Sequence, residues 1–149
     1  TNDLSSPDGM WFDHSNLLWI QTDDGAYTDV TNCMMLAASP GSVGDGGAAT
    51  LNGQATLKGR NPGADLRRFL VGPKQCELTG LTSSPDGKAL FANIQHPGES
   101  GSFGTPSSNW PDPSGNAMTG ADDGTALGSR RPRSATIVIT RTDGGVIGL

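Results

Sequence analysis

The sequence predicts an all-β fold of short antiparallel strands joined by turns and by long loops rich in glycine and proline. The 149 residues include 22 glycines and 10 prolines, about one residue in five, well above the usual roughly 12%. Hydrophobic residues make up only 34% of the chain, which argues against a helical bundle. Apolar residues nevertheless recur in short runs along the whole sequence, as expected for strands.

The strand pattern begins with a phrase that occurs twice. Ser-Pro-Asp-Gly stands at residues 6–9 and again at residues 84–87, and strand-like residues follow each copy. After the first copy we expect a strand at 10–12, a polar turn, and a second strand at 17–23. Around the second copy the expected strands are 81–83 and 88–95.

The two copies do not play the same part. When they are aligned on their tight turns, Asp86-Gly87 corresponds to Ser15-Asn16 and not to Asp8-Gly9. The sequence therefore predicts that Asp86 lies at an exposed hairpin tip, whereas Asp8 precedes a strand.

The remaining elements follow in chain order. Strands are predicted at 33–38, 66–71 and 135–141, and residues 146–149 are expected to close a hairpin over the Asp-Gly-Gly turn. One helical turn fits residues 64–69. The stretches 39–63 and 97–132 are predicted to be long loops because of their glycine, serine, proline and aspartate content.

A strand, a tight turn and a returning strand are typical of a propeller blade, whose innermost strand begins near the central axis. The sequence accordingly predicts an incomplete β-propeller of about two blades within residues 1–149.

Charge and hydropathy exclude several classes of protein. With 10 basic and 15 acidic residues the formal charge is −5, which does not suit a non-specific nucleic-acid binder or a protein of anionic membrane surfaces. No stretch is apolar for the roughly 18 residues that a transmembrane helix needs, and the first residues do not read as a signal peptide. Cys33 and Cys76 lack zinc-type spacing and are predicted to be two buried thiols.

Two acidic residues stand before predicted inner strands, and they are the candidate metal ligands. Asp8 lies between Pro7 and Gly9, and Glu77 precedes the strand that leads into the second turn. Calcium prefers six to eight oxygen ligands, and carboxylates in these places would point toward a propeller's central channel. The alternative for Asp8 is an ordinary turn aspartate.

A second polar group stands at the end of a predicted strand. The phrase Asn-Ile-Gln-His-Pro-Gly-Glu, residues 93–99, places His96 and Glu99 where active-site residues are common. Arg130, Arg131 and Arg133 precede the last strand, and their guanidinium groups suit phosphate oxygens, although the favoured interpretation is that they are basic residues flanking an exposed loop.

Taken together, these phrases resemble the C-terminal part of the PhoX-type bacterial alkaline phosphatases. The resemblance rests on the two Ser-Pro-Asp-Gly phrases, the Asn-Ile-Gln-His-Pro-Gly-Glu phrase, and Arg-Pro-Arg-Ser-Ala-Thr-Ile-Val-Ile, in the right order. The first phrase also resembles a strand of the regucalcin and gluconolactonase propellers, in which this aspartate binds the central calcium.

The resemblance implies an exported, periplasmic or extracellular phosphatase that hydrolyses phosphate monoesters and holds calcium and iron in its central channel. It implies that Asp8 and then Glu77 are metal ligands and that His96 and Glu99 lie at the substrate rim. Most of the family's metal ligands, including a cysteine bound to iron, would lie upstream of this sequence. The remaining blades, or another chain, would then complete the propeller.

Two alternatives remain at this stage. One is a related calcium-dependent propeller lactonase or esterase. The other is a structural or binding fragment that has no catalytic activity when isolated.

Overall fold

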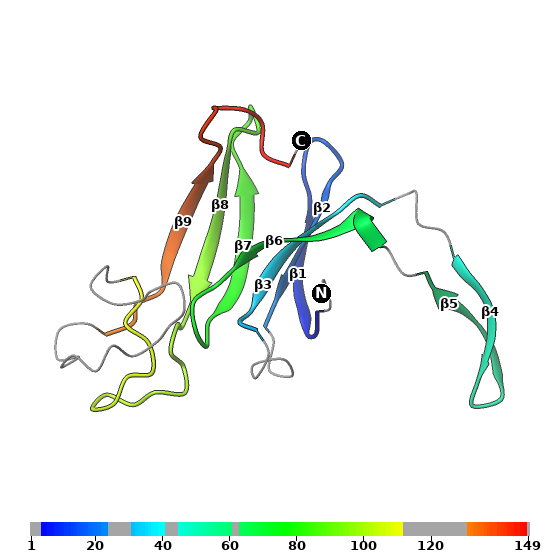
Figure 1. Cartoon of the computed structure of the whole chain (residues 1–149), viewed down its shortest axis with the longest axis horizontal. Helices are drawn as coiled ribbons and strands as arrows, with labels where there is room; N and C mark the ends of the chain where they lie inside the picture. The colour runs from blue at the N-terminus through cyan, green and yellow to red at the C-terminus, as the bar shows by residue number, and fades with distance from the viewer. Residues whose placement is uncertain (1–3, 24–30, 41–44, 61–62, 112–130, 149) are drawn as a thin grey trace.

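The chain folds into antiparallel β-sheets. The computed structural model describes residues 4–23, 31–40, 45–60, 63–111 and 131–148. Within these residues the regular structure consists of strands and one turn of 3₁₀ helix, η1 (Gly63–Asp65), which confirms the all-β prediction (Figure 1).

Two sheets form the body of the molecule, and a separate hairpin extends from it. The first sheet has the order β1 (Pro7–Phe12), β2 (Leu18–Thr22), β3 (Met34–Ala38) and β6 (Leu66–Val71). The second has the order β7 (Glu77–Ser83), β8 (Ala89–Gln95) and β9 (Ala135–Thr140). The hairpin consists of β4 (Asp45–Leu51) and β5 (Gln54–Gly59).

The turn between β1 and β2 is organised by one aspartate. Asp13 Oδ1 accepts hydrogen bonds from the main-chain N–H groups of Ser15, at 2.8 Å, and Leu17, at 3.0 Å. Its other oxygen, Oδ2, accepts a 3.0 Å hydrogen bond from Trp19 Nε1. Asn16 has φ +62°, a left-handed conformation that asparagine tolerates better than most residues. The turn therefore fixes the indole that enters the core.

The turn between β7 and β8 has the corresponding role in the second sheet. Asp86 Oδ1 accepts hydrogen bonds from Ser84 Oγ, at 2.7 Å, and from the N–H of Lys88, at 3.2 Å. Gly87 has φ +69°. The structure thus confirms that Asp86-Gly87 lies at an exposed hairpin tip, and that Asp8 instead lies in the first strand of its sheet.

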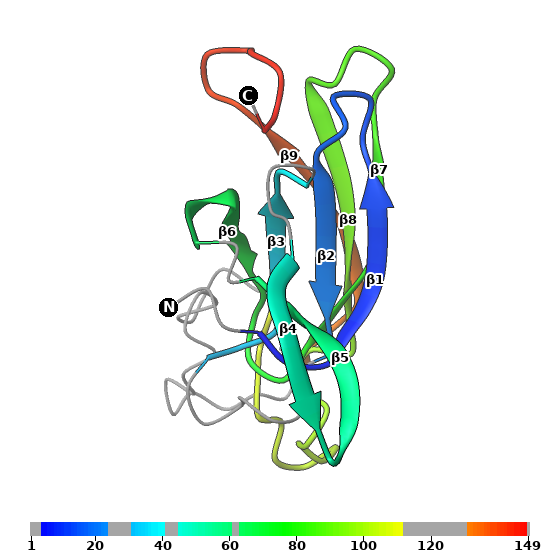
Figure 2. The same cartoon turned by 90° about the vertical axis from the view of Figure 1, so that its right-hand side faces the viewer.

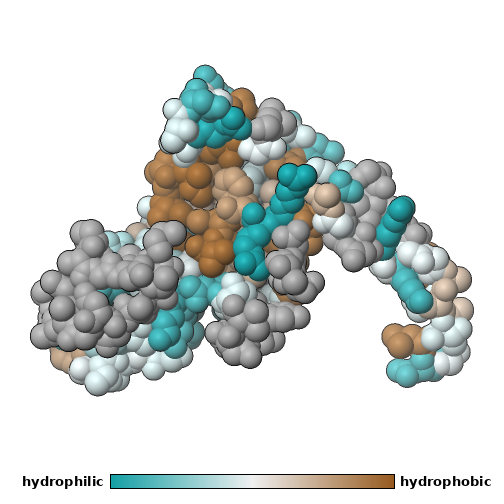
Figure 3. Space-filling view, viewed as in Figure 1, coloured by the Kyte–Doolittle hydropathy of each residue, from teal (hydrophilic) through white to brown (hydrophobic). Residues whose placement is uncertain are grey.

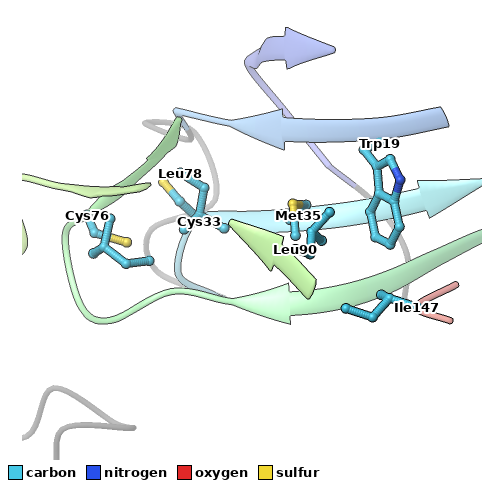
Figure 4. Close-up of a cluster of buried hydrophobic side chains, with 8 residues drawn as sticks. Trp19, Cys33, Met35, Cys76, Leu78, Leu90 and Ile147 are labelled. Carbon is cyan, nitrogen blue, oxygen red and sulfur yellow. The ribbon is translucent and has the colours of Figure 1, made fainter. Parts of the chain in front are cut away.

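The core lies between the two sheets. Its buried residues come from both, and they form one cluster (Figure 4): Trp19, Cys33, Met35, Cys76, Leu78, Leu90, Ile94 and Ile147. Both cysteines are thiols in this cluster, as the sequence predicts. The Phe69 ring packs edge-on against Trp19, with 4.8 Å between the ring centroids.

The last residues connect the two sheets. Ile147 is buried, and its N–H donates a 3.0 Å hydrogen bond to the Gly87 carbonyl in the turn of the second sheet. Gly148 has φ +87°, and a Cβ there would lie 2.7 Å from Leu17 Cδ2 in the turn before β2 and 3.3 Å from Trp19 Cζ2 on β2. The expected strand at 146–149 does not form over its described residues, because this segment packs across the sheets and not along β9.

The hairpin of β4 and β5 lies in a stretch that the composition predicts as a loop, residues 39–63. That prediction is wrong for residues 45–59, which pair as two antiparallel strands. The hairpin projects from the body in Figure 1 and faces the viewer in Figure 2, and the side chains of β5 are exposed. At its base, the Ser39 N–H donates a 2.8 Å hydrogen bond to the Asp65 carbonyl, so the chain leaves and re-enters the body at one place.

Several apolar side chains remain at the surface. Figure 3 shows hydrophobic residues gathered over β9 and the strands beside it. Val138 on β9 is 58% exposed, and on β1 Met10 and Phe12 are 70% and 51% exposed. Within the described residues, no helix is both long and apolar enough to cross a membrane.

Candidate functional site

The two predicted metal ligands occupy corresponding places in the two sheets. Asp8 is the second residue of β1 and Glu77 is the first residue of β7. These are the first strands of their sheets, and they lie against each other in the body. Both strands start at the lower end of the molecule in Figure 1. The structure therefore brings the two carboxyl groups close together, and the proximity of Asp8 helps to raise the pKa of the Glu77 carboxyl group.

Glu77 is the buried member of this pair, with only 8% of the residue exposed. Burial is the main cause that raises the pKa of its carboxyl group above the ordinary value. The charge of Asp23 and the proximity of Asp8 raise this pKa further, whereas the hydrogen bond with His96 lowers it. Two further acidic side chains therefore lie close enough to oppose the ionisation of Glu77.

His96 lies on the other side of Glu77. It directly follows β8, whose last residue, Gln95, pairs with Glu77 across the sheet. The distance from His96 Nε2 to Glu77 Oε2 is 3.3 Å, and the distance from His96 Nδ1 to Glu99 Oε2 is 3.6 Å. The imidazole thus stands between the buried Glu77 carboxylate and the exposed Glu99 carboxylate.

The turn that carries His96 and Glu99 is held from three directions. The N–H of His96 donates a 3.0 Å hydrogen bond to Ser134 Oγ. The N–H of Gly98 donates to the Lys74 carbonyl at 2.9 Å, and the Gly98 carbonyl accepts from Ser107 Oγ at 3.0 Å. The phrase at residues 93–99 therefore encodes a strand end and a well-anchored turn.

Asp23 is a further acidic residue near the site that the sequence reasoning missed. It directly follows β2, and its N–H donates a 3.1 Å hydrogen bond to the Ser6 carbonyl beside the start of β1. In an antiparallel hairpin, the residue after the second strand lies next to the residue before the first. This strand register is the signal from which the proximity of Asp23 to Asp8 could have been predicted.

Other candidate residues lie elsewhere. The guanidinium of Arg131 stacks over the Phe103 ring, 3.2 Å from its centroid, and the N–H of Arg133 donates to the Trp110 carbonyl at 3.0 Å. Arg130 lies outside the described residues. In the part of the chain that the structure describes, no three histidine, cysteine, aspartate or glutamate residues are grouped so that they could hold a metal ion.

The fold and this geometry define an all-β protein whose paired sheets gather carboxylates and an imidazole at one end of their strands. Residues 1–98 match the family described as "Alkaline phosphatase PhoX". Because this match covers more than half of the 149 residues, the chain belongs to the PhoX alkaline phosphatase family.

A solved structure supports the same assignment. The chain is similar to Pseudomonas fluorescens PhoX in complex with vanadate, a transition state analogue, with a TM-score of 0.60 and 35% sequence identity. The similarity covers 95% of this chain and 19% of that chain, so the sequence spans about a fifth of the length of the phosphatase it matches. No curated protein matches the sequence.

Proposed function

We propose that this chain is part of an exported, metal-dependent alkaline phosphatase that hydrolyses phosphate monoesters. The observation that supports this most directly is the meeting of Asp8 and Glu77 at the starts of the first strands of two sheets. Membership of the PhoX family supports the reaction class. We further propose that the two sheets are blades of a propeller, which other parts of a longer chain or another chain complete.

The residues present suit a calcium ion better than an iron ion. Two carboxyl groups in contact, one of them buried, provide the oxygen ligands that calcium prefers. Their mutual repulsion, together with the nearby charge of Asp23, would be relieved by a divalent cation. The thiols of Cys33 and Cys76 lie in the hydrophobic core, so an iron thiolate ligand must come from outside this chain.

In this proposal each residue has a separate task. Bound metal ions would stabilise the negative charge that develops on the phosphoryl oxygens. Glu77 supplies a buried carboxylate held in place by β7, and Asp8 supplies an exposed carboxylate beside it. His96 and Glu99 stand at the rim, where a phosphate ester would approach. Because calcium needs six to eight ligands, further oxygen atoms must come from other blades or from water.

The experiment replaces the matching fifth of Pseudomonas fluorescens PhoX with residues 1–149 and measures release of phosphate from an aryl phosphate in the presence of calcium. We expect Asp8→Asn and Glu77→Gln each to reduce kcat/KM by about 100-fold or more, because each removes a ligand charge at a metal. Asp86→Asn is the matched control, since it changes the same type of side chain in the second Ser-Pro-Asp-Gly phrase, at an exposed turn. We expect it to retain the activity of the unsubstituted chimera.

Isothermal titration of the chimera with calcium chloride provides a second measurement that does not depend on phosphatase activity. We expect Glu77→Gln to weaken calcium binding about tenfold or more. Equal activity and equal calcium binding in all variants would contradict the proposal. An active chimera that cleaves a lactone or an aryl ester, but no phosphate monoester, would contradict the phosphatase assignment.

A further inference from the structure

His96 has a backbone conformation that its neighbours must maintain. Its φ is +33°, in the left-handed region that residues with a Cβ rarely adopt. The contacts on both sides are specific: the His96 N–H is bonded to Ser134 Oγ at 3.0 Å, and the Gly98 N–H to the Lys74 carbonyl at 2.9 Å. Backbone in such regions persists only where the surrounding structure enforces it, and it is common at functional sites.

This conformation determines what the imidazole contacts. Nε2 lies 3.3 Å from Glu77 Oε2, within hydrogen-bond distance. Nδ1 is buried and has no hydrogen-bond partner among the described residues; its distance to Glu99 Oε2 is 3.6 Å. Among these residues the ring therefore makes its hydrogen bond with the buried Glu77 carboxyl group. An ionised carboxylate can only accept a hydrogen bond, so Nε2 is the donor when Glu77 is ionised.

We propose that His96 is a positioning residue: its Nε2–H group holds the Glu77 carboxylate in the orientation that binds a divalent cation together with Asp8. This inference rests on the proposed function, because Glu77 is the ligand that His96 would orient. Partners that fix metal ligands in this way commonly contribute about 10- to 100-fold to metal affinity.

The residue type is explained by two requirements. Histidine and asparagine are both enriched at positive φ, so either suits the backbone at this position. Only a side chain that reaches as far as Nε2 can also donate to Glu77. The amide nitrogen of glutamine is as many bonds from Cα as Nε2 of histidine, whereas that of asparagine is one bond nearer.

These requirements make His96→Gln and His96→Asn a matched pair. If His96 only stabilises the turn, asparagine should be the better replacement for both thermal stability and calcium binding. If His96 positions Glu77, thermal stability and calcium affinity should rank the two variants in opposite orders. His96→Asn should then have the higher Tm, and His96→Gln should have the higher calcium affinity.

The measurements are the Tm and the calcium dissociation constant of the chimera that carries residues 1–149, with calcium chloride as the only ligand. We expect His96→Ala and His96→Asn to weaken calcium binding by about 10- to 100-fold and His96→Gln to recover most of this loss. Calcium affinities of glutamine and asparagine variants that follow the order of their Tm values would overturn the inference. Loss of calcium binding in Glu77→Gln but in none of the His96 variants would also overturn it, while leaving the proposed function intact.

A metal-free measurement tests the same contact. Long-range ¹H–¹⁵N spectra of the calcium-free chain report which ring nitrogen carries the proton. We expect it on Nε2 in the unsubstituted chain, with a chemical shift of the Nε2 proton that changes in Glu77→Ala because its hydrogen bond is lost. A proton on Nδ1, or an Nε2 proton whose chemical shift Glu77→Ala does not change, would overturn the inference. If the unsubstituted chimera binds no calcium, the proposed function fails at this site, and the chemical shift of the Nε2 proton alone decides whether His96 holds Glu77.

Discussion

Cys76 shows how the environment of a single residue determines its chemistry. Its thiol is buried in the hydrophobic cluster, and burial, followed by the proximity of Cys33, raises its pKa from 9.0 to about 12. The thiolate is the nucleophile in alkylation, so a thiol that remains protonated and buried is unreactive. The residue therefore behaves as a small apolar side chain.

We expect Cys76 of the folded chain to resist iodoacetamide at a pH close to 9.0, its ordinary pKa, and to react fully in denaturing urea. Peptide mass spectrometry of the alkylated chain measures this directly. Because the folded state raises the pKa, the stability that this thiol contributes is fully present below pH 9.0 and is lost as the pH rises toward about 12. Rapid labelling of Cys76 in the native chain would contradict this account.

At this scale the sequence predicts a great deal. The same tetrapeptide gives Asp8 and Asp86 different roles, and their different distances from the tight turns were enough to distinguish them. The contact between His96 and Glu77 was beyond sequence reasoning, because it depends on the positive φ of His96 and on the Ser134 hydrogen bond. Neither the positive φ nor this hydrogen bond produces a recognisable pattern in the sequence.

Among the elements, we expect the removal of the hairpin of β4 and β5 to reduce the stability of the fold least. It is inserted between β3 and β6, which pair directly, with Ala38 opposite Leu66. The side chains of β5 are exposed, and the Ser39–Asp65 hydrogen bond closes the base of the insertion.

Replacing residues 45–59 with a short Asn-Gly turn should therefore change the free energy of unfolding by no more than about 0.5 kcal/mol, because none of these described residues belongs to the core cluster. Urea denaturation of the two chains gives this difference. As a comparison, removing residues 146–149 should be strongly destabilising, because Ile147 belongs to the core. A large loss on replacing the hairpin would show that it packs on the body.

The same hairpin shows why one element was missed. Its strands contain Gly46, Gly47 and several small residues, so composition favours a loop. The adjacent Asn52 and Gly53 have φ +50° and +78°, as in a type I′ turn, and Asn-Gly is the strongest short-range hairpin signal. Local turn chemistry here was more informative than average composition.

At the scale of the whole molecule, several apolar side chains are exposed on the surface. A surface of this kind is usually covered by another element or another chain. Val138 is 58% exposed on β9, which in the described residues pairs only with β8, and such edges promote association. The chain's 19% coverage of its solved relative fits the proposal that other blades lie there.

We accordingly expect the isolated chain to self-associate with increasing concentration and Val138→Lys to shift this association to higher concentration, because a charge on an edge strand opposes pairing. Sedimentation velocity over a dilution series measures the change. Thr140→Lys, on the same exposed side of β9, separates a general effect of charge from an effect of removing the apolar side chain. A monomer at every concentration for the unsubstituted chain would contradict this expectation.

Whole-molecule features set the limit of what one sequence can predict. The sequence predicts that Asp8 and Glu77 both precede inner strands, and the structure places these two strands against each other. The full set of metal ligands could not be predicted, because the described part of this chain contains no group of three metal-binding side chains. A site shared among blades becomes visible only when all of the blades are present.

The way the last residues cross the molecule has a mechanical consequence. Ile147 is inserted between the sheets and bonded to the Gly87 carbonyl, while Gly148 sits against Leu17 and Trp19. A pulling force applied to the carboxyl end would therefore act first on this crossing segment and only afterwards on the ladder between β8 and β9. In a force-extension experiment we expect this segment to detach first, after which the two sheets can separate.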